Sequence, residues 1–194
     1  MNTLRSIFLL VLLLFSGSLV FSQSASWTPY KADFFPTNAS GQIHGISRVS
    51  QMKFHPTNSS KLYAVSARGG LFISSNGGTS WSVAPGSDIL SLDTRFASVC
   101  IDHTNDQTIY LGGGDHNYYS SGSGVWKSSN GGTTFTQTTL TGKIIVEMIM
   151  DPNNNQIIVA ATNTGIYKTT NAGSTWTLKS GNIAFDDMVR KANT

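Results

Sequence analysis

The sequence predicts an all-β fold, a partial β-propeller of about three four-stranded antiparallel blades arranged in an open ring. Two internal repeats carry this prediction, because repetition at a fixed period determines an architecture before any single residue does. The first repeat begins at Gly70, Gly124 and Gly165, and the second begins at Phe54, Ile101 and Met150. No segment after the N-terminal 22 residues shows a helical period.

Each copy of the first repeat reads as a β-hairpin: a short apolar and polar alternation, a turn of Asn-Gly or Asn-Ala-Gly, then a hydroxyl residue and an aromatic residue. Each copy of the second repeat reads as a strand end, a polar turn and the start of another strand. Joined, they form a four-stranded unit, with strands of the first unit expected near 49–55, 62–67, 70–75 and 80–83. Such units in radial repetition are typical of a β-propeller, whereas a β-helix needs shorter rungs and a sandwich does not repeat its sequence.

The N-terminal residues have the features of a secretory signal peptide. Arg5 supplies the positive charge, Ile7–Phe15 form an apolar run too short to span a membrane, and cleavage is expected before Gln23. We therefore expect a secreted protein with no membrane span after cleavage. The expected organisation is a signal peptide at 1–22, a lead-in segment at 23–46 and a partial propeller at 47–194, with blades at about 49–83, 96–138 and 144–178 and the start of a fourth at 183–194.

Propellers usually close their ring with at least four blades. The expectation is therefore that this chain is the N-terminal part of a longer protein, whose remaining sequence supplies the rest of the propeller. Closure by self-association of three-bladed pieces is the alternative.

Charge and cysteine content exclude two classes of protein. Charged residues make up 12% of the chain, and the 13 basic residues are scattered, so the basic stripe that a nucleic-acid partner requires is absent from the sequence. Cys100 is the only cysteine, which excludes an internal disulfide. Its place in the apolar run Phe96–Ile101 predicts a buried thiol.

The repeated turn follows the pattern Ser/Thr-x-Asn-x-Gly-x-Ser/Thr-aromatic and resembles the Asp-box (BNR) repeat of sialidases, xyloglucan-cleaving glycosidases and sortilin-type propellers. All three copies carry Asn where that family usually has Asp. Asn still closes the turn, but it provides no ring of carboxylates, so neither a metal nor another cofactor is expected. The final aromatic residue is expected to pack between blades. The matching positions are Ser74, Asn76, Gly78, Ser80 and Trp81; Ser128, Asn130, Gly132, Thr134 and Phe135; and Thr169, Asn171, Gly173, Thr175 and Trp176.

A broader resemblance runs through the segments Gln42–Ile46, Tyr63–Leu71, Gly112–Asp115 and Gly124–Ser128. These segments are similar to those of large secreted bacterial propellers, which often carry a C-terminal sorting domain for export across the outer membrane. The resemblance implies an extracellular or cell-surface location.

Because neighbouring strands of a blade run in opposite directions, their connections emerge alternately at its two ends, which predicts two faces of the propeller. The Asn-Gly turns and the Pro/Asn turns share one face, while the loops between second and third strands and the links between blades emerge on the other. That second face carries an expanded loop in the second blade, and insertions on a regular scaffold usually hold function. The candidate ligand-binding residues there are Arg68, Asp88, Asp93, Arg95, Asp115, His116, Tyr118 and Tyr119.

The function expected from these residues is non-catalytic binding, recognition or assembly at the cell surface, with a glycan or a protein as ligand. The alternative is the N-terminal part of a secreted glycoside hydrolase, which needs two carboxyls placed across one bond. Xyloglucan-cleaving relatives place an acid in a loop where this chain has Ser66-Ala67-Arg68-Gly69-Gly70, and the Arg-Ile-Pro segment of sialidases is absent from the sequence. The resemblance therefore favours binding over catalysis, and no catalytic residue is assigned.

Overall fold

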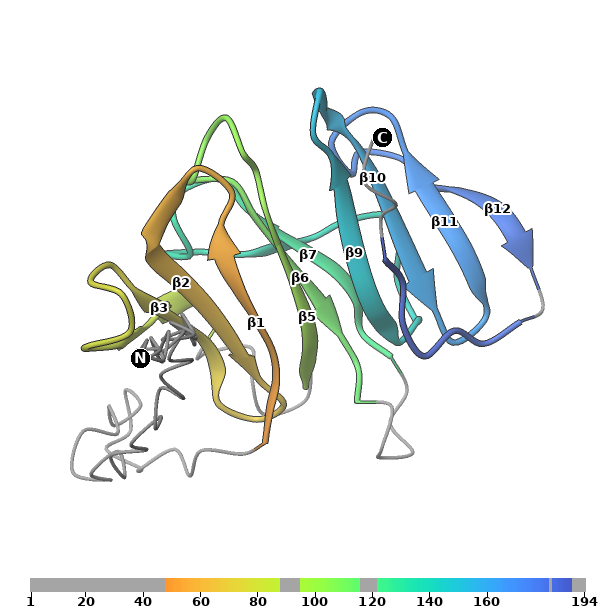
Figure 1. Cartoon of the computed structure of the whole chain (residues 1–194). Helices are drawn as coiled ribbons and strands as arrows, with labels where there is room; N and C mark the ends of the chain where they lie inside the picture. The colour runs from red at the N-terminus through yellow and green to blue at the C-terminus, as the bar shows by residue number, and fades with distance from the viewer. Residues whose placement is uncertain (1–47, 88–94, 116–121, 182, 190–194) are drawn as a thin grey trace, which may run out of the picture. The chain divides into compact units, whose positions relative to one another are not determined.

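The computed structural model describes residues 48–87, 95–115, 122–181 and 183–189, all within one compact unit. These residues form three four-stranded antiparallel sheets, and the strands of each sheet lie in sequence order (Figure 1). The all-β prediction of three four-stranded blades is confirmed. Blade 1 holds β1 (Val49–His55), β2 (Asn58–Ser66), β3 (Gly70–Ser74) and β4 (Ser82–Val83); blade 2 holds β5 (Phe96–Ile101), β6 (Ile109–Gly113), β7 (Gly124–Ser128) and β8 (Thr136–Gln137); blade 3 holds β9 (Ile145–Asp151), β10 (Asn154–Thr162), β11 (Gly165–Thr169) and β12 (Thr177–Gly181).

Two local features differ from the sequence prediction. Strand β2 begins at Asn58 rather than near residue 62, because Asn58 pairs with His55 across a tight turn. Residues 85–87 form a helical turn where no helix was expected. Pro85 suits a first helical position, and Ser87 caps the turn by donating from its backbone N and its Oγ to Ala84 O, at 3.0 and 2.7 Å. A single turn is too short to show a helical period in sequence.

The repeated turn has the same hydrogen bonds in all three blades. In blade 2, Asn130 Oδ1 accepts from Ser128 Oγ at 2.9 Å and from Thr134 N at 3.0 Å, while Asn130 Nδ2 donates to Thr134 Oγ1 at 2.9 Å. Asn76 and Asn171 make the equivalent bonds in blades 1 and 3. The three asparagines therefore occupy equivalent hairpin turns, as predicted.

Each repeated turn is also bonded to the chain at or just before the start of the second strand of its blade. Gly77 N donates to Ser60 O at 2.8 Å, and Gly131 N and Ala172 N make the same bond to Gln107 O and Gln156 O. Both kinds of turn thus lie at one end of each sheet, which we call the turn face. The β2–β3 connections and the links between blades lie at the other end, the loop face (Figure 1).

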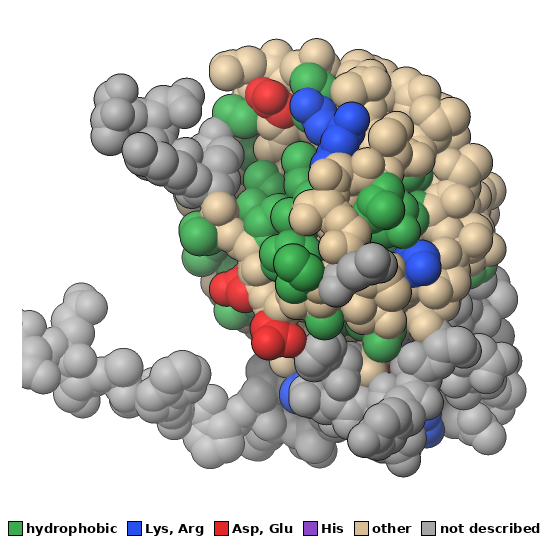
Figure 2. Space-filling model, turned by 90° about the vertical axis from the view of Figure 1, so that its right-hand side faces the viewer, with side chains coloured by type: hydrophobic (Ala, Val, Ile, Leu, Met, Phe, Trp, Pro, Cys, Tyr) green, Lys and Arg blue, Asp and Glu red, His purple; other side chains and the backbone are tan. Residues whose placement is uncertain are grey.

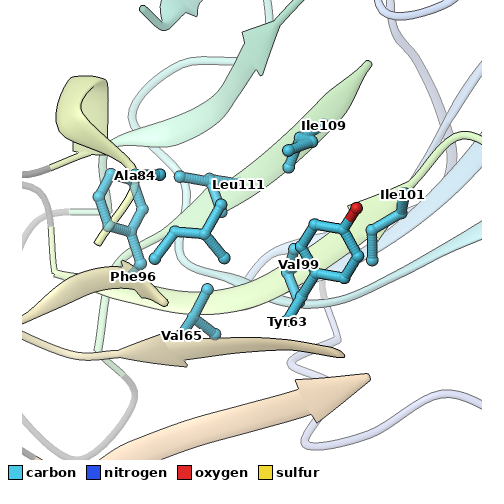
Figure 3. Close-up of a cluster of buried hydrophobic side chains, with 9 residues drawn as sticks. Tyr63, Val65, Ala84, Phe96, Val99, Ile101, Ile109 and Leu111 are labelled. Atoms are coloured by element: carbon cyan, nitrogen blue, oxygen red, sulfur yellow. The ribbon is translucent and has the colours of Figure 1, made fainter. Parts of the chain in front are cut away.

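Two apolar clusters join neighbouring blades. Between blades 1 and 2, buried side chains of β2 meet those of β5 and β6, among them Tyr63, Val65, Val99 and Leu111 (Figure 3). A second cluster joins blade 2 to blade 3. Phe135 packs against the first cluster and Trp176 against the second, so these two repeat-ending aromatics lie between blades as predicted, whereas Trp81 of blade 1 belongs to neither cluster.

Candidate functional site

The first strands of the blades bring polar groups together at the loop face. Strand β5 contacts both β1 and β9, so residues near the start of these strands become neighbours. They surround an open cavity of about 310 Å³, which we call the loop-face cleft. Its lining residues are Arg48, Ser50, Gln51, Ala97, Asp115, Val146, Glu147, Asp186 and Asp187.

An ion pair between blades 1 and 2 forms one part of this cleft. Arg48 Nη2 lies 2.6 Å from Asp115 Oδ1, and the Asp115 side chain is 9% exposed whereas that of Arg48 is 49% exposed. Asp115 follows Gly114, whose φ of 107° and bond from its N to Arg95 O at 2.6 Å set the chain direction after β6. The expanded loop therefore begins with a carboxylate fixed in place by the neighbouring blade.

A second network crosses from blade 1 to blade 3. Gln51 Nε2 donates to Glu147 Oε2, and Gln51 Oε1 accepts from Val99 N at 2.8 Å. Lys53 Nζ lies 2.5 Å from Glu147 Oε1 and donates to Met148 O at 3.0 Å. Gln51 and Lys53 thus satisfy backbone groups of β5 and β9 that no strand pairs with, and they hold Glu147 at the cleft wall.

The cleft is acidic and contains one unsatisfied hydroxyl. Its described lining residues include four carboxylates and one cation, Arg48, while Lys53 reaches Glu147 from outside the lining. Asp186 and Asp187 are exposed. Ser50 Oγ is buried and has no hydrogen-bond partner within the part of the chain that the structure describes.

The structure places the predicted site residues unevenly. Asp115 lines the cleft, whereas Arg68 is exposed on the β2–β3 turn and does not line it. Arg95 is half-buried with φ 38°, and it too is absent from the cleft lining. The predicted residues Asp88, Asp93, His116, Tyr118 and Tyr119 lie outside the described residues.

Sequence reasoning missed Arg48, Ser50, Gln51, Glu147, Asp186 and Asp187. One signal for Glu147 was available, because it is the only glutamate of the chain and interrupts the apolar run Ile144–Met150. A carboxylate inside an apolar strand is buried only when it is paired. Its partners could not be read from sequence, since Gln51 lies 96 residues away.

A different cavity lies at the opposite end of the first strands. This hollow of about 390 Å³ on the turn face is walled mainly by apolar side chains, including Phe54, Ile101 and Met150. Lys53 lines it, and Glu147 lines the loop-face cleft, so their ion pair lies between the two cavities.

The described residues contain no cluster of three or more His, Cys, Asp or Glu side chains that would hold a metal ion. A search of the same residues for a helix long and apolar enough to cross a membrane finds none.

Comparison with solved structures identifies the architecture. An ancestral GH74 enzyme superposes with a TM-score of 0.56 at 23% identity, over 71% of this chain and 19% of that one. The chain folds as part of a β-propeller. The Niastella koreensis GH74 enzyme gives a TM-score of 0.52 at 23% identity, over 69% of this chain and 23% of the enzyme. The GH74 xyloglucanase from Xanthomonas campestris gives a TM-score of 0.54 at 19% identity, over 69% of this chain and 21% of the xyloglucanase.

This partial propeller spans about a fifth of the length of each of these structures. At such identities the likeness extends to the fold alone, since propellers host many functions. No protein-family model matches the chain, and no curated protein matches it in sequence.

Proposed function

We propose that this chain is part of a secreted, non-catalytic propeller that binds a ligand in the loop-face cleft, for recognition or assembly at the cell surface. The observation that carries the proposal is the buried Ser50 hydroxyl in the wall of this polar cavity, which has no hydrogen-bond partner among the described residues. A buried hydroxyl without a partner is costly, and a bound ligand that hydrogen-bonds to it removes that cost.

The charge of the cleft narrows the ligand. With four carboxylates and one arginine among its described lining residues, the cleft disfavours phosphates and other anions. Arg48, Gln51 and the carboxylates offer both donors and acceptors, which suits the hydroxyls of a neutral glycan. A basic protein segment is the second ligand class compatible with this charge. The repeated turns, which we propose are Asp-box repeats, lie on the opposite face and stabilise the blades.

A catalytic function in this cleft is less well supported. A glycosidase needs one carboxyl that delivers a proton and a second that acts across the scissile bond. The two buried carboxylates, Asp115 and Glu147, are each in an ion pair, at 2.6 Å to Arg48 and 2.5 Å to Lys53. Their presence in one cavity is nonetheless the feature that keeps the N-terminal part of a glycoside hydrolase as a second candidate.

A binding assay with matched variants tests the proposal. We expect xyloglucan oligosaccharides or another neutral glycan of a panel to bind saturably in calorimetry, without release of reducing sugar. Ser50→Ala should weaken binding about threefold to tenfold, the equivalent of one hydrogen bond, while leaving the melting temperature unchanged or higher. Arg48→Gln should weaken it further, whereas Arg68→Gln is the control outside the cleft.

Other outcomes would exclude the proposal or change the ligand class assigned to the cleft. Binding that Ser50→Ala and Arg48→Gln leave untouched would place the ligand elsewhere. Release of reducing sugar that Asp115→Asn abolishes would establish the glycosidase. Saturable binding of basic peptides alone would assign the cleft to a protein ligand.

Secretion is part of the same proposal and is tested separately. We expect the exported protein to begin at Gln23, and mass spectrometry of its N-terminal peptide measures this directly. Retention of residues 1–22 in the mature protein would contradict it.

A further inference from the structure

Each blade has two faces that differ in the side chains they present. Strand register makes Met52, Val99 and Met148 equivalent, because they pair with Ala64, Leu111 and Ala160 on the second strands. These residues, together with Phe54, Ile101 and Met150 two positions further along each strand, form what we call the back face. The opposite side, which holds Tyr63, Tyr110 and Val159, is the forward face.

The back faces of blades 2 and 3 are buried, and that of blade 1 is not. Val99 and Ile101 are 0% and 5% exposed, and Met148 and Met150 are 0% and 9% exposed. Their equivalents in blade 1, Met52 and Phe54, are 57% and 63% exposed. Blade 1 therefore presents an apolar surface that its two sister blades cover with a neighbour.

The forward faces show the complementary difference. Tyr63 and Leu71 in blade 1, and Tyr110 and Val125 in blade 2, are fully buried against the next blade. The equivalents in blade 3, Val159 and Ile166, are only half-buried. Figure 2, which views the molecule from the side on which blade 3 lies in Figure 1, shows hydrophobic side chains gathered in an open patch.

A polar contact of the existing interface also has its counterparts on these open faces. At the interface between blades 2 and 3, Lys127 Nζ donates to Ala172 O of the repeated turn at 3.0 Å. Lys168 is the equivalent of Lys127 in blade 3, and Gly77 is the equivalent of Ala172 in blade 1. The donor and acceptor of a further interface of the same kind are therefore both present.

We propose that two copies of this chain associate head to tail, the forward face of blade 3 in each copy packing on the back face of blade 1 in the other. The two new interfaces repeat the interfaces between blades 1, 2 and 3, with Lys168 Nζ bonded to Gly77 O across each. The segment 183–189 stays bonded to the loop-face end of blade 3 through Phe185 N and Thr162 O at 3.2 Å, so Asp186 and Asp187 keep their places in the cleft. The Ile183 and Val189 side chains of this segment are 57% and 88% exposed.

Sedimentation of the purified protein over a range of concentrations tests the proposal. We expect the mass to rise from one copy to two, and Phe54→Asp and Val159→Asp each to raise the dissociation constant at least about tenfold, because each buries an unpaired charge. Leu178→Asp is the matched control, since Leu178 is 49% exposed and pairs with Tyr167, away from both open faces. Circular dichroism shows whether each variant is folded.

Mixing the two variants distinguishes head-to-tail association from other modes. A Phe54→Asp copy keeps its forward face and a Val159→Asp copy keeps its back face, so the mixture should form a one-to-one complex through one intact interface. Dimers of Val159→Asp alone would show a symmetric back-to-back contact and overturn the proposal. A mass of one copy at all concentrations would overturn it equally.

Discussion

Replacing Asn130 by alanine tests whether the repeated turns stabilise the blades. The change removes three hydrogen bonds: those that Asn130 Oδ1 accepts from Ser128 Oγ at 2.9 Å and Thr134 N at 3.0 Å, and the one that its Nδ2 donates to Thr134 Oγ1 at 2.9 Å. A net hydrogen bond contributes about 1 kcal/mol. Water replaces part of this at the exposed Thr134, so we expect a loss of about 2 kcal/mol in the free energy of unfolding.

Asn130→Asp separates the turn geometry from the chemistry of the amide. The carboxylate keeps the two accepted bonds, and the Thr134 hydroxyl rotates to donate to it, so the expected change is below about 1 kcal/mol. Asn153→Ala is the control, because Asn153 closes its turn through its backbone N, bonded to Asp151 Oδ1 at 2.8 Å, and alanine keeps that bond.

Urea unfolding followed by circular dichroism measures all three variants. The reasoning fails if Asn130→Ala unfolds at the same urea concentration as Asn153→Ala. It also fails if Asn130→Asp is as unstable as Asn130→Ala, because the turn would then need the amide itself.

Three further predictions concern stability and reactivity elsewhere. Burial raises the pKa of the Cys100 thiol from 9.0 to about 11, so alkylation at pH 8 should be at least about 100-fold slower in the folded protein than in urea. Ala172 has a φ of 52° where the equivalent Gly77 has 68°, so Ala172→Gly should stabilise by about 0.5–1 kcal/mol and Gly77→Ala should destabilise, both measured by thermal melting. Hydrogen bonds from Lys61 and, to a smaller extent, from Gln107 lower the pKa of Asp106 below 3.8, so the stability from these contacts is complete above that value and is lost as the pH falls through the depressed pKa. Lys61→Met should reduce this pH dependence in urea titrations between pH 2 and about 6.

Features that depend on residues close in sequence were predictable. The side-chain hydrogen bonds that close the repeated turn join residues at most four positions apart, from Ser128 to Thr134 in blade 2, so the local pattern specifies them. The sequence prediction placed the start of β2 near residue 62 and not at Asn58, because Asn has a low strand propensity. Only the pairing of Asn58 with His55 places it in the sheet.

The candidate site depends on contacts between blades, which local patterns do not encode. Asp115 was predicted from the expansion of its loop, but its partner Arg48 lies 67 residues away. Arg68 was predicted as a binding residue because its loop emerges at the same loop face, yet the structure leaves it exposed and outside the lining of the cleft. Parity assigns a residue to an end of its blade, whereas its distance from the first strands decides whether it reaches the cleft.

Differences between equivalent positions indicate which residues the fold itself does not require. Gln51, Ser98 and Glu147 occupy one position of the repeat, and Lys53 and Cys100 occupy another. A requirement of the blade would select similar residues at each copy, as it does for the three asparagines of the turns. The unlike polar residues at the first strands instead complement one another across blades, where Gln51 and Lys53 both bind Glu147. The repeated residues therefore stabilise the scaffold from the turn face, and this leaves the loop-face ends of the first strands free to differ between blades, where they line the loop-face cleft.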